Sequence, residues 1–233
     1  MAQKLVQYSY KLKKQKQHNL ALIITTVVSV FVVLKLVMTF LIYPVRQTSV
    51  SMQPDFPENS FVMLTPLGSN FQRGDVVLLD SRQRLQPKLY KRIANVFVSF
   101  FTARQFSLFE NDSIPGTKKQ LRRIVGLPGD TIYMKDYILY VKPKGEKHFL
   151  SEFEISKHTY NVTFYVPPSD WDHSIGVKGT FEPVVLSYDE YFVLSDNRKA
   201  SDDSRLWGPV KKNRICARAL ICYFPFDKFK IFN

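Results

Sequence analysis

Ser51 is the residue of this chain best placed to act as a nucleophile, within the run Ser-Val-Ser-Met-Gln-Pro at residues 49–54. A serine hydroxyl is a weak nucleophile at neutral pH, and it attacks a carbonyl only when a nearby base takes its proton. Ser51 lies eight residues after Tyr43, which ends a long apolar segment. The sequence therefore predicts nucleophilic chemistry close to a membrane, provided that the fold brings a base to Ser51.

The apolar segment before this serine runs from Leu20 to Tyr43 and contains a single charged residue, Lys35. Its 24 residues would form a helix about 36 Å long, enough to cross a hydrocarbon core of about 30 Å. Lys35 lies near the far end, from which its long side chain reaches the lipid–water interface. A cleaved signal peptide would have a shorter apolar core and a small-residue cleavage site. We therefore interpret residues 19–43 as a transmembrane helix.

Positive charge flanks mainly one end of this segment. Five lysines and no acidic residue precede it, whereas only Arg46 follows closely on the other side. Flanking lysines and arginines are retained in the cytoplasm. We therefore expect residues 1–18 to form a cytoplasmic basic tail and residues 44–233 to form an extracytoplasmic domain. The chain would be a single-pass protein of the plasma or inner membrane.

The formal net charge of the chain is +13. Six of these positive charges belong to lysines up to residue 35, so seven remain on the predicted extracytoplasmic domain. Such a charge suits contact with the anionic face of a lipid bilayer, and an ordinary basic surface explains it equally well. No nucleic-acid-binding motif accompanies the charge, and we expect no nucleic-acid partner.

Cysteine and histidine usage argues against disulfides and metal sites. Cys216 and Cys222 would lie on one face of a strand, about 20 Å apart, which is too far for a mutual disulfide. The four histidines are scattered without the spacing of metal ligands. We predict no metal and no cofactor.

Short runs with the composition of β-strands dominate the rest of the chain. Most of them end at Gly, Pro, Asn, Asp or Ser, as strands do. The two runs at 131–134 and 137–141 predict a hairpin. The fold class we expect is mainly β and antiparallel, behind one N-terminal transmembrane helix. The runs lie at 61–64, 75–80, 122–125, 131–134, 137–141, 160–166, 190–194 and 214–224.

Two regions lack this pattern, and we expect insertions near 81–120 and 143–188. The first contains an aromatic run at 93–109, preceded by basic residues. A basic start with aromatic anchors is typical of a segment in the membrane interface, while packing in the protein core is the alternative. The second insertion is rich in proline, glycine and charged residues.

Three blocks of residues follow the predicted anchor in order: SVSMQP at 49–54, RRIVGLPGD at 122–130 and SDNRKASDDSRLWGPV at 195–210. The run RGDVVLLD at 73–80 lies between the first two. Together they resemble the type I signal peptidases, also called leader peptidases. The resemblance implies that this family's β-rich catalytic fold extends over about residues 44–225.

The resemblance also assigns roles to individual residues. Ser51 is the nucleophile, and a neutral lysine acts as general base in a Ser-Lys variant of the catalytic triad. The backbone N–H of Ser51 and the hydroxyl of Ser49 form the oxyanion hole. Ser201 orients the lysine, and Asp203 and Arg205 form a supporting ion pair.

This chain departs from the family at the general base, because Arg122 occupies the position of the lysine. A lysine that is desolvated enough becomes partly neutral near pH 7. An arginine guanidinium stays protonated at any relevant pH, so Arg122 cannot take the proton of Ser51. The exchange of lysine for arginine at this position therefore removes the general base that the resemblance implies.

Three interpretations of the site follow. In the first, another lysine is the base. Lys91 is preferred, because Tyr90-Lys91-Arg92-Ile93 resembles the start of the family's second block and follows the run at 73–80 at a plausible distance. Lys118 and Lys119 are nearer in sequence but would stand about 10–13 Å along an extended strand from Arg122. In the second, the chain has lost catalysis and kept peptide binding. In the third, Arg122 holds Ser51 and a water while another group takes the proton.

The function that the resemblance implies is that of a membrane-bound serine endopeptidase. Such an enzyme removes N-terminal signal peptides from pre-proteins that emerge from the export channel, cutting after small residues at positions −1 and −3. The alternative is a catalytically impaired homologue that acts as a membrane-tethered peptide-binding or assembly factor. A usable neutral base near Ser51 distinguishes the two functions.

Overall fold

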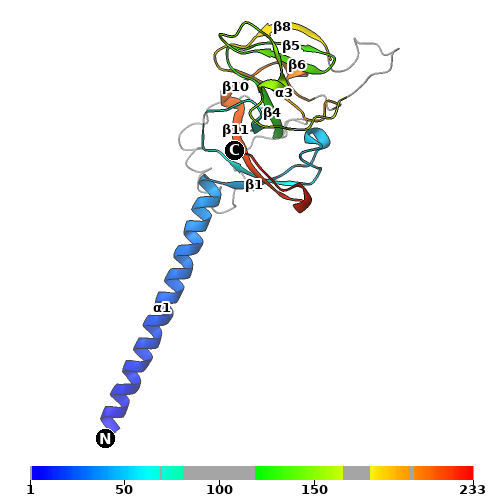
Figure 1. The fold of residues 1–233 in the computed structure, drawn as a ribbon. Coiled ribbons are helices and arrows are strands. Elements are labelled where there is room, and N and C mark those ends of the chain that lie inside the picture. Colours follow the sequence, from blue (N-terminus) through cyan, green and yellow to red (C-terminus); the bar gives the residue numbers. More distant parts are fainter. Residues whose placement is uncertain (1, 69, 81–118, 165–178, 200–201, 233) are drawn as a thin grey trace.

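The computed structural model describes residues 2–68, 70–80, 119–164, 179–199 and 202–232. A long N-terminal helix leads into a β-rich body (Figure 1). The aromatic run at 93–109 and two predicted site residues, Lys91 and Ser201, lie outside the described residues.

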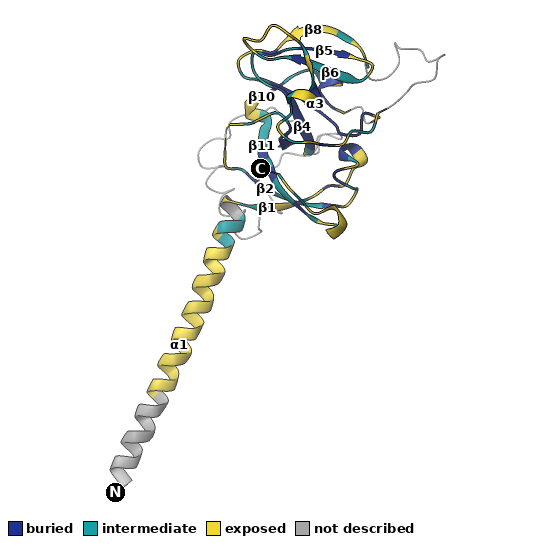
Figure 2. Ribbon diagram, viewed as in Figure 1, coloured by how far each residue is buried: buried dark blue, intermediate teal, exposed yellow. Residues whose placement is uncertain are grey.

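Helix α1 extends over Ala2–Phe40, and its stretch Lys14–Met38 is long and apolar enough to cross a membrane. None of the most apolar part of this stretch is buried in the structure, and Figure 2 colours most of it yellow, the colour of exposed residues. The helix continues further towards the N-terminus than the predicted span, because lysine and glutamine are good helix formers. It also ends earlier than predicted: Phe40 is its last residue, and Tyr43 begins strand β1.

Two antiparallel sheets form the body, as the sequence predicted. The larger sheet has eight strands in the order β1-β2-β11-β3-β4-β9-β10, with β12 paired to β11, and the smaller has four in the order β7-β6-β5-β8. Strands of the larger sheet are β1 (Tyr43–Arg46), β2 (Phe61–Thr65), β11 (Ile215–Phe224), β3 (Val76–Leu79), β4 (Gln120–Gly126), β9 (Glu190–Leu194), β10 (Val210–Lys211) and β12 (Lys230–Ile231). Strands of the smaller sheet are β7 (Leu150–Ser151), β6 (Ile138–Lys142), β5 (Thr131–Lys135) and β8 (Phe181–Val185).

Short helical segments connect these strands. They are η1 (Val50–Met52), α3 (Glu152–Ile155), α4 (Ser204–Trp207), η2 (Lys212–Arg214) and η3 (Phe226–Lys228).

The predicted hairpin is confirmed as β5 and β6, which pair from Thr131↔Lys142 to Lys135↔Ile138. Its turn residues Asp136 and Tyr137 have φ angles of 51° and 65°. Positive φ at both central residues is what a two-residue hairpin turn of type I′ requires. The turn therefore forms without the Asn-Gly pair that favours it most.

The prediction of a strand at 160–166 is wrong for residues 160–164, the part that the structure describes. Only Thr163 pairs there, through an isolated bridge to Asn197. The side chain of Tyr160 is committed elsewhere: its ring lies under the guanidinium of Arg123 at 4.2 Å, and its hydroxyl donates to Glu152 at 2.7 Å. These contacts hold the segment across the body instead of along a sheet edge.

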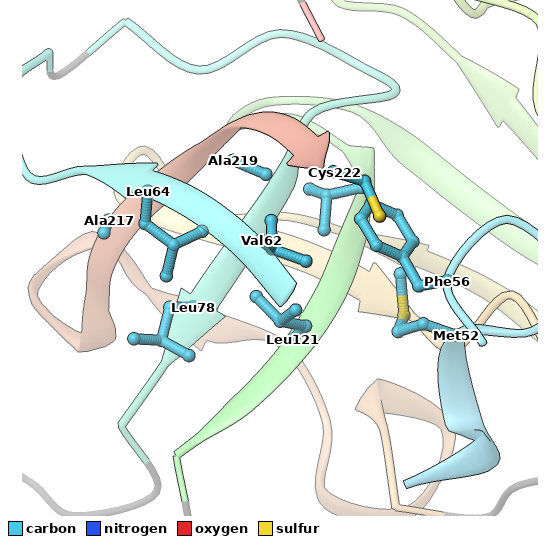
Figure 3. Packing of buried hydrophobic residues seen from close by; sticks show 10 residues of the cluster. Met52, Phe56, Val62, Leu64, Leu78, Leu121, Ala217, Ala219 and Cys222 are labelled. Carbon is cyan, nitrogen blue, oxygen red and sulfur yellow. The ribbon is translucent and has the colours of Figure 1, made fainter. Parts of the chain in front are cut away.

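The core next to the serine-containing helix η1 is one apolar cluster formed by β2, β3, β4, β11, the last residue of η1 and the segment that follows it (Figure 3). Met52 and Phe56 insert into this cluster and are 0% exposed. In β2, Val62 and Leu64 alternate inwards, as expected for a strand with one buried face. Met52 thus fixes its neighbour Ser51 against a rigid layer.

Strand β11 pairs with β2 and β3 and also with the C-terminal strand β12. The structure forms no disulfide between its two cysteines, Cys216 and Cys222. The prediction that they do not bridge each other is confirmed.

Candidate active site

Ser51 lies in the short helix η1, and its side chain is in a mostly buried position with 5% exposure. Asn197, from the loop after β9, holds this helix in place with two hydrogen bonds. Its backbone N–H donates to the Ser51 carbonyl at 2.9 Å, and its side-chain amide donates to the Val50 carbonyl at 3.2 Å. The first and third sequence blocks therefore meet at Ser51.

The Ser51 hydroxyl has three side-chain partners among the residues that the structure describes. Its oxygen lies 2.8 Å from the Ser49 hydroxyl, 3.0 Å from Nη1 of Arg122 and 3.4 Å from Nε2 of Gln47. Arginine and the amide are donors, so the Ser51 oxygen accepts from both. The site thus polarises the hydroxyl, and the base that would take its proton must be a different group.

Ser49 occupies the N-cap of η1, where its hydroxyl oxygen faces the backbone N–H of Ser51 at 3.5 Å. The two groups predicted for the oxyanion hole are therefore adjacent. Gln47 orients Ser49 by donating to its carbonyl at 3.0 Å and to its hydroxyl at 3.1 Å. No motif marks Gln47 in the sequence, and only the turn between β1 and η1 reveals it.

Arg122 is a residue of β4, where it pairs with Val77 of β3. Its side chain is 3% exposed, and Nε and Nη2 of the guanidinium donate to the Asp202 carbonyl at 2.8 and 2.6 Å. Nη1 donates to the Leu121 carbonyl at 2.5 Å as well as to Ser51. Burial lowers the pKa of Arg122 below its usual value, while the nearby charges of Asp203 and Asp202 raise it. An arginine with this many acceptors stays a charged donor.

A cleft of about 280 Å³ opens beside these groups, between the β1–η1 turn and the start of β4. Apart from its arginines, Lys119 and Asp202 are the lining residues with titratable side chains. Lys119 thus reaches the same cleft as Ser51, although three positions separate it from Arg122. The lining residues are Val45, Arg46, Gln47, Thr48, Ser49, Val50, Ser51, Leu78, Lys119, Gln120, Leu121, Arg122 and Asp202.

Asp203 and Arg205 form the ion pair that the resemblance implies. Arg205 donates to the carboxylate through Nε at 2.9 Å and Nη2 at 2.7 Å, and both side chains are 0% exposed. Burial raises the pKa of Asp203, but the hydrogen bonds and charge of Arg205 outweigh it, so that the pKa is lowered. Asp203 also accepts from the Ser195 N–H at 3.1 Å. The pair thus fixes the loop that carries Asp202 to Arg122.

Arg123, the neighbour of Arg122 in β4, belongs to a second buried network. Its guanidinium donates to Asp196 at 2.8 and 2.5 Å, to the Gly74 carbonyl at 2.7 Å and to Asp55 at 3.5 Å. Successive side chains of a strand point to opposite faces. Of the two arginines in the second block, Arg122 therefore contacts Ser51, whereas Arg123 holds the loops that support the site.

A family model described as signal peptidase, peptidase S26, matches residues 20–224 of the chain. Signal peptidase I P of Bacillus subtilis subsp. natto is 26% identical, covering 94% of this chain and 96% of its own. Signal peptidase I of Bacillus licheniformis is 28% identical and covers 92% and 94%. Signal peptidase I of Bacillus amyloliquefaciens is 30% identical and covers 72% and 85%.

Proposed function

The chain belongs to the signal peptidase S26 family, and from that premise we propose that it is a membrane-anchored serine endopeptidase that removes N-terminal signal peptides from exported pre-proteins. The observation that carries the proposal is the hydroxyl of Ser51, which lies beside the cleft between Ser49 at 2.8 Å and Arg122 at 3.0 Å. Acyl transfer needs a serine in an accessible cleft together with a base that takes its proton.

The anchor supports this function because it restricts where Ser51 can act. Helix α1 ends at Phe40, and strand β1 leads within a few residues to η1. Signal peptides are themselves held in the membrane, so nucleophile and scissile bond would share one thin layer. Such confinement raises the rate of encounter. The N-terminal lysines support a cytoplasmic N-terminus and an extracytoplasmic body.

The cleft supports cleavage after small residues at positions −1 and −3. Its volume of about 280 Å³ is modest, and Val45, Leu78 and Leu121 contribute apolar side chains to its lining. These side chains offer apolar contact to the short side chains of an extended peptide, and the preference for small residues itself is carried over from the family.

Arg122 supplies electrostatic stabilisation in this proposal. Its positive charge at 3.0 Å lowers the free energy of the Ser51 alkoxide and of a transition state that passes through it. A lysine takes the proton. Two lysines are candidates: Lys91, which the sequence favours and which lies outside the described residues, and Lys119, which lines the cleft.

Cleavage of a radiolabelled pre-protein by the full chain in lipid vesicles tests the proposal. We expect Ser51→Ala to lose activity by roughly 10⁴-fold or more. Either Lys91→Ala or Lys119→Ala should lose it comparably and thereby identify the base, while Lys135→Ala, at an exposed position of β5, serves as the matched control.

An inactive wild type together with an active Arg122→Lys variant would contradict the peptidase proposal. That result would support the alternative of a catalytically impaired, membrane-tethered peptide-binding factor. Equal activity of wild type and Ser51→Ala would exclude Ser51 as the nucleophile.

A further inference from the structure

The cleft beside Ser51 is lined by more positive than negative side chains. Its single carboxylate, that of Asp202, accepts hydrogen bonds from Gln120 and, at 3.1 Å, from Nε1 of Trp207. The same carboxylate lies 4.0 Å from Nη2 of Arg122. Its negative charge is thus engaged by groups of the protein, and the cleft presents a positive charge to a bound peptide. The charged lining residues are Arg46, Lys119, Arg122 and Asp202.

Arg46, the last residue of β1, is exposed and lines this cleft. Its Nη2 donates a hydrogen bond to Oδ1 of Asn59 at 3.0 Å. This partner is a neutral amide, and no acidic residue in the described part of the chain forms an ion pair with Arg46. The guanidinium of Arg46 therefore offers an uncompensated positive charge to a ligand in the cleft.

The turn that carries Asn59 holds the Arg46 side chain in place. Asn59 has a φ angle of 66°, in the left-handed region that asparagine adopts more readily than most residues. Its backbone N–H donates to the Gln47 carbonyl at 2.6 Å, and the Gln47 N–H donates to the Ser60 carbonyl at 2.8 Å. A side chain that is already ordered loses less conformational entropy when it binds a ligand.

The chain between Arg46 and Ser49 sets which substrate residue Arg46 can reach. Three residues span at most about 11 Å, so Arg46 lies within that distance of Ser49 and the oxyanion hole. An extended peptide covers the same distance from position −1, whose carbonyl the oxyanion hole binds, to position −4. Successive side chains of an extended peptide point to opposite faces. With −1 and −3 on the apolar lining, −2 and −4 face the exposed side chains, of which Arg46 is one.

We propose that Arg46 selects substrates by charge, favouring an acidic side chain at position −4 and disfavouring a basic one. This inference rests on the proposed function, because it takes the cleft to bind the residues before the scissile bond. An arginine and a carboxylate form a charge-assisted hydrogen bond, whereas a lysine at −4 would bring two positive charges together. Because Arg46 is exposed, the ion pair should change the rate by a factor of up to about five.

Pre-proteins that differ only at position −4, with glutamate, glutamine or lysine there, test the proposal. The full chain cleaves them in a neutral detergent, which keeps lipid charge out of the measurement of kcat/KM. The enzymes are wild type, Arg46→Gln, Arg46→Glu and Lys135→Glu. Arg46→Gln removes the charge and keeps a donor for Asn59. Lys135→Glu, at an exposed position of β5, is the matched control, because it changes the net charge of the chain as Arg46→Glu does.

For the wild type we expect the glutamate substrate to be cleaved about tenfold faster than the lysine substrate, since attraction and repulsion add. This ratio should vanish in Arg46→Gln, invert in Arg46→Glu and stay unchanged in Lys135→Glu. Every variant should cleave the glutamine substrate at the rate of the wild type. Added salt should reduce the wild-type ratio, because salt screens exposed charges.

Equal ratios in wild type and Arg46→Glu would overturn charge selection by Arg46 and leave the peptidase function intact, because the substrates would still be cut. A second series of substrates varies position +3, on the other side of the scissile bond. An effect of Arg46 that occurs at +3 and is absent at −4 would also overturn the proposal. A wild type that cuts none of the substrates would contradict the proposed function, and the charge selection with it.

Discussion

The Arg122 guanidinium donates a hydrogen bond of 3.0 Å to the Ser51 hydroxyl oxygen. A lysine at that position, once neutral, would accept the serine proton, whereas an arginine can only donate. The exchange of one basic residue for another thus reverses the direction of this hydrogen bond. In the proposed function, the positive charge stays beside the developing alkoxide, and another side chain has to accept the proton.

Replacing Arg122 with lysine should restore a base at this position. The site is almost fully buried, and burial lowers the pKa of a lysine. We expect cleavage to increase by up to about a hundredfold, with a pH–rate profile that rises as the new lysine loses its proton. Arg122→Gln is the comparison, since it removes the charge without adding a base, and its rate should fall below that of the wild type. An Arg122→Lys profile identical to that of the wild type would refute this role.

Replacing Asp203 with asparagine should destabilise the body. The change leaves the Arg205 guanidinium charged, fully buried and without its carboxylate, and loss of one partner of a buried pair costs about 3–5 kcal/mol. Urea unfolding of the full chain in detergent measures the free energy. The control is Asp202→Asn. The Asp202 side chain is 52% exposed, so removing its charge should lower the free energy of unfolding by less than about 1 kcal/mol. Equal losses in both variants would contradict the prediction.

The same ion pair predicts how stability depends on pH. The pKa of Asp203 is lowered from its ordinary value of 3.8 by Arg205, which outweighs the effect of burial. A lowered folded-state pKa contributes stability that is fully present above the unfolded-state pKa. This contribution is lost as pH falls below about 4 and through the folded-state value. Unfolding titrations should therefore show a steeper acid loss for wild type than for Asp203→Asn, and parallel curves would exclude Asp203 as a source of the slope.

Much of the larger sheet is predictable from sequence because its strands bury apolar residues between turn-forming residues. Strands β3 and β9 have continuous apolar runs, and β9 begins and ends where the sequence predicts. The segment at 160–164 is also rich in residues that favour strands, yet it forms no ladder, and its Tyr160 ring packs on Arg123. Local composition carries no information about such a distant polar partner.

The candidate active site, too, is only partly predictable from the sequence. Ser51, Asp203 and Arg205 are identified by their blocks, and the structure brings Ser51 and Arg122 into contact across 71 positions of the chain. Gln47 and the Asp202 carbonyl have no sequence signal, because their roles arise from the turn after β1 and from the loop before α4. A backbone carbonyl in particular can be assigned to a site only from the fold.

Replacing Gln47 with alanine should impair catalysis without affecting the fold. The amide of Gln47 donates to the Ser49 carbonyl, to the Ser49 hydroxyl and, at 3.4 Å, to the Ser51 hydroxyl. Without it, the Ser49 hydroxyl is free to rotate away from the position where an oxyanion would form. Removing one oxyanion donor costs about 10²–10³ in rate, so we expect Ser49→Ala to lose that much and Gln47→Ala to lose about tenfold.

Thr48→Ala is the control for these two variants, because Thr48 lines the same cleft but is exposed and lies between them in sequence. Single-turnover cleavage of a pre-protein separates the chemical step from peptide binding. The rate of Gln47→Ala should fall while its substrate affinity stays within about twofold, and the double variant with Ser49→Ala should be no slower than Ser49→Ala alone. Additive losses in the double variant would mean that Gln47 acts on Ser51 directly and does not act through Ser49.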